Sequence, residues 1–288
     1  MIQNFIAICH SHPMLVGGIV SLMVGSFLNV VIYRFPKILF FQWTSQSHEW
    51  LNKEPYTDEE PATLSKPASH CYACKKTIKV WQNIPVISYL LLRGKCGNCA
   101  APISLRYPLI ELLTAVLSIY VIYRFGATWQ SVFGVMLTWV LITLSFIDFD
   151  HQLLPDDIVL PTLWAGLALS LLPVYASPTD SIIGAIIGYL FFWVIFHLFK
   201  LITGKDGMGH GDFKLLSLFG AWLGWQFLPQ IILISTLVGS IAGVSLMLIK
   251  KTNGSNKIPF GPYIAIAGYI ALVWGKEINS TYLKLSGF

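Results

Sequence analysis

The chain has 288 residues, of which 55% are hydrophobic, 14% aromatic and only 11% charged. Soluble domains carry roughly 25% charged residues, so this composition excludes an ordinary soluble globule, and its many aromatic residues exclude an intrinsically disordered chain. With a mean hydropathy of +0.65 and a net charge of +5, the chain is predicted to be a polytopic membrane protein.

Eight apolar stretches divide the chain, most of them near the length of about 20 residues that crosses a bilayer as a helix. They are continuously apolar rather than alternating, which favours helices over a β-barrel. The stretches cover residues 14–33, 107–123, 129–147, 158–175, 181–201, 213–228, 231–249 and 262–274. We therefore predict an all-α polytopic fold with about eight transmembrane helices.

The basic residues predict the orientation of these spans. Sixteen of the nineteen Lys and Arg residues fall on one side, ten of them between the first two stretches, whereas Arg124, Lys276 and Lys284 fall on the other. By the positive-inside rule the N-terminus faces outward and the long loop is cytoplasmic. No Lys or Arg precedes the first stretch, so we do not expect a cleaved secretory signal there.

Three parts of the chain follow from this topology. Residues 1–33 hold the first span, residues 34–106 form the cytoplasmic loop, and residues 107–288 form a domain of seven spans. The start of the loop carries Phe40, Phe41, Trp43 and Trp50. Bulky aromatic residues favour the membrane interface, so this segment is predicted to be either an interfacial helix or an ordinary loop.

Four cysteines in the loop form two CxxC pairs, Cys71 with Cys74 and Cys96 with Cys99, separated by twenty-one residues. Two such pairs can offer four thiolates to one tetrahedral zinc ion. Disulfides are the alternative, but a reducing cytoplasm disfavours them. We predict a structural zinc site, because four protein ligands leave no open position for water.

Acidic residues gather in two further loops on the cytoplasmic side. Residues 147–157 read IDFDHQLLPDD, and residues 207–214 read GMGHGDFK. Two carboxyl groups at similar depth can share one proton, so that one acts as a base toward water while the other acts as an acid. From the residues alone, Asp148 and Asp150 are equal candidates beside Asp212, and Asp156, Asp157 and Asp212 are also candidate helix N-caps.

Glu111 is the one acidic residue inside the second apolar stretch. A carboxyl group within a membrane span needs a partner, and it raises the expectation of a function. A neutral, hydrogen-bonded structural glutamate is the equal alternative.

These motifs together resemble the bacterial type IV prepilin peptidases, and the resemblance covers nearly the whole chain. It is carried by GSFLNVVIYR at residues 25–34, both cysteine pairs, NIPVISY at 83–89, LRGK at 92–95, YPLIELL at 107–113, the acidic stretch at 147–156 and GHGD at 209–212. GxGD alone is a weak motif, but the whole set in this order is specific.

The resemblance implies a GxGD-type intramembrane aspartyl protease of the bacterial inner membrane. It assigns the catalytic pair to Asp148 and Asp212, and makes Asp150, Asp156, Gly209, Gly211 and Lys214 accessory candidates along with Glu111. It also implies zinc on Cys71, Cys74, Cys96 and Cys99. The expected substrates are type IV prepilins and type II secretion pseudopilins, cut after a Gly on the cytoplasmic side. Membrane lipid surrounds the enzyme, and no nucleic acid partner is expected.

The resemblance implies a second activity, N-methylation of the new N-terminal residue, usually Phe. S-adenosylmethionine is the expected methyl donor, and Gly94 is the residue associated with methylation. No Gly-rich dinucleotide-type fingerprint is present in the sequence, so the sequence does not locate the donor pocket.

Three other functions compete with this interpretation. A transporter would use Glu111 and Asp148 as an ion pathway, but most acidic residues here lie at one membrane boundary rather than deep in several spans. A zinc-containing assembly factor without catalysis would tolerate Asp212→Asn. The segment HEWLN at 48–52 lacks the second histidine of HExxH, so a zinc metalloprotease is not expected.

Overall fold

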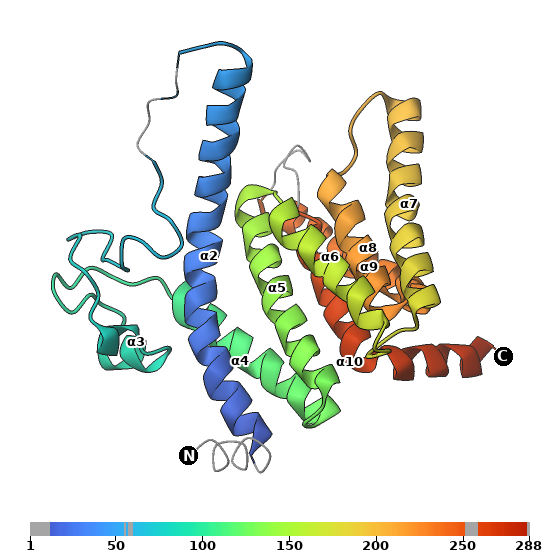
Figure 1. Cartoon of the computed structure of the whole chain (residues 1–288), viewed down its shortest axis with the longest axis horizontal. Helices are drawn as coiled ribbons and strands as arrows, with labels where there is room; N and C mark the ends of the chain where they lie inside the picture. The colour runs from blue at the N-terminus through green and yellow to red at the C-terminus, as the bar shows by residue number, and fades with distance from the viewer. Residues whose placement is uncertain (1–11, 55, 57–59, 251–258, 287–288) are drawn as a thin grey trace. The chain divides into compact units, whose positions relative to one another are not determined.

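The computed structural model describes residues 12–54, 56, 60–250 and 259–286. The chain folds as two compact units, residues 1–127 and 128–288. Within the described residues the structure is helical, without a named strand (Figure 1), which confirms the predicted all-α class. The elements are α2 (Pro13–Trp50), η1 (Val80–Asn83), α3 (Ile87–Leu91), α4 (Arg106–Phe125), α5 (Trp129–His151), α6 (Asp156–Ser170), α7 (Pro178–Thr203), α8 (His210–Leu223), η2 (Trp225–Phe227), α9 (Leu228–Lys250) and α10 (Gly261–Ser286).

In the first unit, α2 packs against α4. The two backbones approach closely at Gly25, where an added Cβ would come within 2.8 Å of the Cα of Glu111. Nearby, the Asn29 side chain donates hydrogen bonds of 3.2 Å to the carbonyl oxygens of Gly25 and Tyr107. Small residues at such a crossing allow helices to associate within a membrane.

Helix α2 is longer than a membrane crossing requires. Its 38 residues extend about 57 Å at ~1.5 Å per residue, against a hydrocarbon core of about 30 Å. The aromatic segment at residues 40–50 forms the last turns of this helix. The ordinary-loop alternative is therefore wrong, and the segment continues α2 instead of forming a separate helix in the interface. Because α2 far exceeds the hydrocarbon thickness, one end of it must extend beyond the core.

In the second unit, α8 is the central helix, and every residue from 215 to 223 on it is buried. It lies against α7 so closely that a Cβ on Gly220 would meet the carbonyl oxygen of Gly184. Hydroxyl groups reinforce this pair: Ser181 donates to the carbonyl of Ala221, and Ser217 to that of Ala185. Helix α8 also contacts α6 and α10, and α5 contacts α10.

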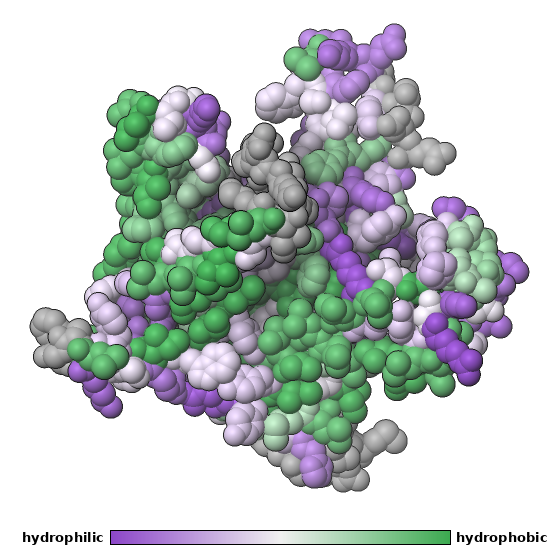
Figure 2. Space-filling view, turned by 180° about the vertical axis from the view of Figure 1, so that it is seen from behind, coloured by the Kyte–Doolittle hydropathy of each residue, from purple (hydrophilic) through white to green (hydrophobic). Residues whose placement is uncertain are grey.

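Five helices of the described chain are long and apolar enough to cross a membrane. They are Pro13–Trp50, Arg106–Phe125, Trp129–His151, Pro178–Thr203 and Trp225–Ser245. Of the remaining predicted spans, α6 has 15 residues and α8 has 14, shorter than the usual ~20. The polytopic fold is confirmed, and the count of eight stays a prediction. Hydrophobic side chains cover much of the face shown in Figure 2, as expected of helices that meet lipid.

Candidate functional site

Asp148 lies in the last turn of α5, buried, with 5% of its surface exposed. Its Oδ2 accepts a hydrogen bond of 3.0 Å from the backbone N–H of Gly261, at the start of α10. Gly261 has no room for a side chain, because a Cβ there would come within 2.6 Å of the same oxygen. The carboxyl group of Asp148 is therefore held by a residue 113 positions later in the chain.

Asp212 occupies the first turn of α8 and is 6% exposed. Asp148 is close enough for its charge to act on Asp212, so the structure brings these two carboxyl groups together. Leu154 is part of the same cluster, since added Cβ atoms would come within 2.8 Å of it at Gly211 and 3.2 Å at Gly261. The end of α5, the start of α8 and the start of α10 thus meet at one point.

Two neighbouring buried carboxyl groups resist simultaneous ionisation, because each charge destabilises the other. One then holds a proton while the other is a carboxylate, which is the arrangement of an acid–base pair. The hydrogen bond from Gly261 favours the ionised form of the group that accepts it. This arrangement is suited to the activation of water for peptide hydrolysis.

The remaining acidic residues of these loops stand apart from the pair. Asp150 and Asp157 are exposed, and both oxygens of Asp156 accept 2.7 Å hydrogen bonds from the ammonium of Lys214. The N-cap residues are Pro155 for α6 and Gly209 for α8. The alternative that Asp156, Asp157 or Asp212 is an N-cap is therefore wrong; these residues occupy first turns, where the helix dipole favours a negative charge.

Gly261 is a site residue that the sequence did not predict. Its position just before the predicted span at 262–274, between Pro259 and Pro262, is typical of a turn rather than of catalysis. Only the fold reveals its role, because its partner Asp148 lies in a different helix. The flanking prolines were the only local sign of a special backbone.

The four cysteines of the loop form one cluster, with all four sulfur atoms within 4.8 Å of one another. The Cys71 and Cys99 sulfurs are 3.8 Å apart, which is about the spacing of sulfurs placed tetrahedrally at ~2.3 Å from one zinc ion. Backbone N–H groups of Cys74 and Ala73 lower the pKa of the Cys71 thiol to about 6, whereas burial and the other three sulfurs raise the pKa of Cys99 to about 11. This donor set could bind a metal.

Both cysteine pairs have the same backbone layout. In the first, the Cys71 N–H donates to Lys76 O at 2.9 Å, and Lys75 N–H to Cys71 O at 3.0 Å. In the second, the Cys96 N–H donates to Ala101 O at 2.8 Å, and Ala100 N–H to Cys96 O at 2.9 Å. Lys75 and Ala100 share a left-handed conformation, with φ of 57° and 58°. Two equivalent knuckles therefore present their sulfurs to one centre.

Gly94 joins α3 to the second knuckle and has a φ of +68°. Its N–H donates to Tyr89 O at 2.9 Å, and its carbonyl accepts from Ile103 N–H at 2.7 Å. An added Cβ would lie 2.8 Å from the Tyr89 hydroxyl oxygen. Both the backbone and the packing therefore require glycine here.

Glu111 is buried in α4, and its Oε2 accepts a 2.8 Å hydrogen bond from the backbone N–H of Val86. Ser26 on α2 supplies a second hydrogen bond. The carboxyl group thus joins both helices of the first unit to the residue that precedes α3. These hydrogen bonds fit the structural alternative for Glu111, and the functional alternative stays open.

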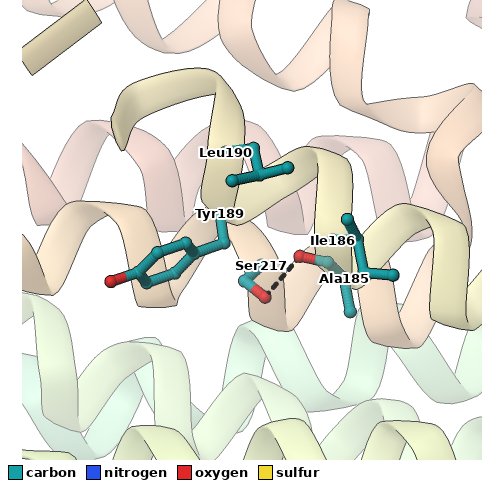
Figure 3. Close-up of a pocket in the computed structure, with 5 residues that line it drawn as sticks. All are labelled: Ala185, Ile186, Tyr189, Leu190 and Ser217. Atoms are coloured by element: carbon teal, nitrogen blue, oxygen red, sulfur yellow. Dashed lines mark hydrogen bonds between the residues drawn. The ribbon is translucent and has the colours of Figure 1, made fainter. Parts of the chain in front are cut away.

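One surface groove of the second unit is too apolar for the methyl donor. Ala185, Ile186, Tyr189, Leu190 and Ser217 line it, with a volume of about 340 Å³. Ser217 donates its hydroxyl hydrogen to Ala185 O at 2.7 Å, while the Tyr189 hydroxyl points away (Figure 3). S-adenosylmethionine carries a charged sulfonium, amine and carboxylate that need polar partners, and these residues do not fit it.

Two family descriptions match the chain. Residues 19–125 match the bacterial peptidase A24 N-terminal domain, and residues 135–244 match the type IV leader peptidase family. The first match contains the cysteine knuckles, Gly94 and Glu111. The second contains Asp148 and Asp212.

Similar proteins align over almost the full chain. A prepilin leader peptidase/N-methyltransferase of Pseudomonas aeruginosa is 51% identical over 281 residues, which cover 96% of this chain and 97% of the relative. Proteins of the same name from Aeromonas hydrophila and Legionella pneumophila are 49% and 46% identical, covering 96% and 93% of this chain and 97% and 94% of the relatives. No solved structure matches.

Proposed function

The chain belongs to the type IV leader peptidase family, and we propose that it cleaves the leader from type IV prepilins and type II secretion pseudopilins. In the same proposal it then methylates the new N-terminal residue, usually Phe. The observation that carries the peptidase activity is the meeting of the buried carboxyl groups of Asp148 and Asp212 at the junction of α5, α8 and α10.

In the proposed reaction, the ionised carboxylate removes a proton from water, and the water oxygen attacks the carbonyl carbon of the scissile peptide. The protonated carboxyl group donates its proton to the carbonyl oxygen, which gives a neutral tetrahedral intermediate. Collapse of this intermediate breaks the C–N bond. The leaving nitrogen takes the proton that the base had received from water, and one hydroxyl returns its proton to the carboxyl group that had donated it, which restores the pair. The buried position of the pair strengthens its electrostatic interactions relative to bulk water.

The distribution of basic residues supports an orientation in which this junction and the cysteine loop face the cytoplasm of an inner-membrane enzyme. A prepilin then lies with its apolar N-terminal segment among the spans while its basic leader stays in the cytoplasm. The scissile bond after Gly reaches Asp148 and Asp212 without translocation of the substrate. Gly209 leaves space for the substrate backbone beside Asp212, because an added Cβ at Gly209 meets nothing nearer than the Asp212 carboxylate, at 3.8 Å.

Zinc is the metal that we propose for Cys71, Cys74, Cys96 and Cys99, because a tetrahedral four-thiolate set is typical of structural zinc. The ion would hold the two knuckles together and so fix the loop that carries Gly94. S-adenosylmethionine would supply the methyl group, and we assign residues 34–106 to this second activity. Asp150 and the Asp156–Lys214 pair remain accessory candidates of the peptidase.

Mass spectrometry of a purified prepilin, incubated with the full-length protein in detergent or nanodiscs, tests both activities. Loss of the leader with and without S-adenosylmethionine, and the gain of one methyl group only with it, are the expected results. An unchanged substrate in the presence of folded protein would favour the transporter or assembly-factor alternative.

A further inference from the structure

We propose that the short helix α3 and the residues around it enter the lipid leaflet on the cytoplasmic side, where anionic phospholipids bind the surrounding basic side chains. This inference rests on the orientation given under Proposed function. It concerns residues 84–91, a segment between the two cysteine knuckles that neither the proposed dyad nor the metal site uses.

The depth of α3 follows from its attachment to α4. Val86, the residue before α3, donates its backbone N–H to Glu111 Oε2 at 2.8 Å. Glu111 lies five residues after Arg106, the start of a candidate membrane span, which is about 7.5 Å along the helix at ~1.5 Å per residue. The start of α3 is therefore level with the second turn of a membrane helix, beside which it is drawn in Figure 1.

The outward surface of α3 is apolar. Ile87, Leu90 and Leu91 are 55%, 68% and 71% exposed, and only Ser88 of this helix is buried. Exposure of three large aliphatic side chains to water is unfavourable, because apolar surface is stabilised by its removal from water. Acyl chains at this depth would cover them. The side chain of Glu111 also fits a lipid environment, because it accepts the hydrogen bond of the Val86 backbone N–H, and a backbone N–H in lipid needs an acceptor.

The charge around this apolar helix has one sign. No acidic residue lies between Glu60 and Glu111, whereas this interval holds seven basic ones: Lys66, Lys75, Lys76, Lys79, Arg93, Lys95 and Arg106. Arg93 and Lys95 follow α3 directly, and both lie at or near the surface. Basic side chains beside apolar ones are typical of segments that bind an anionic membrane surface. Among the occupants that could cover this apolar surface, an anionic bilayer therefore fits best.

Site-specific photocrosslinking tests this placement in the full-length protein. The photoreactive amino acid p-benzoylphenylalanine replaces Leu91, and the protein is reconstituted in nanodiscs of phosphatidylcholine and phosphatidylglycerol. Illumination should add the mass of one phospholipid, attached through an acyl chain. Val116, 52% exposed on α4, is the positive control. Trp50, 87% exposed and about 24 Å along α2 from Arg34 at ~1.5 Å per residue, is the negative control.

The outcomes separate the inference from the topology on which it rests. A lipid adduct at Val116 but none at Leu91, or a protein adduct at Leu91, would overturn the inference alone. No adduct at Val116, or a lipid adduct at Trp50, would overturn the topology as well. Bound metal on the cysteine knuckles verifies that each variant is folded.

A pair of substitutions tests the anchor itself. Glu111→Ala should lose the lipid adduct at Leu91, because Val86 loses its acceptor, whereas Glu111→Gln keeps a side-chain carbonyl and should retain the adduct. Equal adduct yields in the two variants would contradict the role of Glu111 as the residue that positions α3.

Discussion

The backbone N–H of Gly261 donates a hydrogen bond of 3.0 Å to Oδ2 of Asp148, and this contact leaves no space for a side chain at residue 261. In Gly261→Ala the new Cβ would lie 2.6 Å from that oxygen, so the carboxyl group must move. A displacement of about 1 Å at a catalytic group costs about 100-fold in rate. We expect this loss in the initial rate of leader removal, with the helical circular dichroism spectrum retained. A rate near that of the unsubstituted protein would contradict the assignment.

Gly209 and Gly211 should respond differently to alanine. At Gly209 an added Cβ approaches only the Asp212 carboxylate, at 3.8 Å, whereas at Gly211 it would meet Leu154 Cβ at 2.8 Å. Gly209→Ala should therefore leave the melting temperature unchanged and lower kcat/KM, because the substrate backbone must pass there. Gly211→Ala should destabilise the fold by about 1–3 kcal/mol through overpacking. If the Gly209→Ala protein cleaves at the full rate, the substrate backbone does not pass close to Gly209.

Replacement of Cys71 and Cys74 by Ser should release the metal. A four-thiolate site that loses two ligands cannot complete tetrahedral coordination, so we expect less than about one tenth of the metal to remain after dialysis. Elemental analysis of the purified protein gives the metal content. Cys9→Ser, which changes the one cysteine of the sequence outside the two CxxC pairs, is the matched control and should keep the metal. Full retention in the double variant would refute the site.

Gly94→Lys should impair methylation more than cleavage. The substitution forces a left-handed φ of +68° on a lysine and places its Cβ 2.8 Å from the Tyr89 hydroxyl, which distorts the loop beside the second knuckle. Gly204→Lys is the matched control, because Gly204 is left-handed with a φ of +69° but has nothing within 4 Å. Both carry the backbone cost of about 1–2 kcal/mol, and only Gly94→Lys adds the clash. Mass spectrometry of pilin products measures both activities, and equal losses of the two would indicate general damage.

The sequence predicted the parts of the candidate site that depend on local spacing. Each CxxC pair and the GxGD stretch lie within a few residues of one another, so Cys71, Cys96 and Asp212 could be named as candidates without a fold. The contact between Asp148 and Gly261 joins residues 113 positions apart, and no periodicity of one chain reveals such a pair. The bond from Val86 to Glu111 was hidden for the same reason, so the role of Glu111 stayed open.

Hydropathy predicted the helices well, whereas the number of membrane crossings stays a prediction. Helix α8 is buried along most of its length because other helices surround it, and composition cannot distinguish such a core helix from one that faces lipid. Helix α2 shows that a proline does not always mark the end of a helix. Pro36, which would be expected to end a helix, lies inside α2, and the helix continues to Trp50.

The most direct test of the proposed peptidase compares Asp148→Asn and Asp212→Asn with the unsubstituted protein in cleavage of a purified prepilin. Asparagine keeps the shape of each side chain but acts neither as the base nor as the acid of the proposed reaction, so both variants should lose leader removal entirely while they remain folded and membrane-inserted. Asp157→Asn, which changes an exposed aspartate outside the pair, should retain cleavage. Substantial processing by either Asp148→Asn or Asp212→Asn, measured by mass spectrometry of the product, would contradict the catalytic pair.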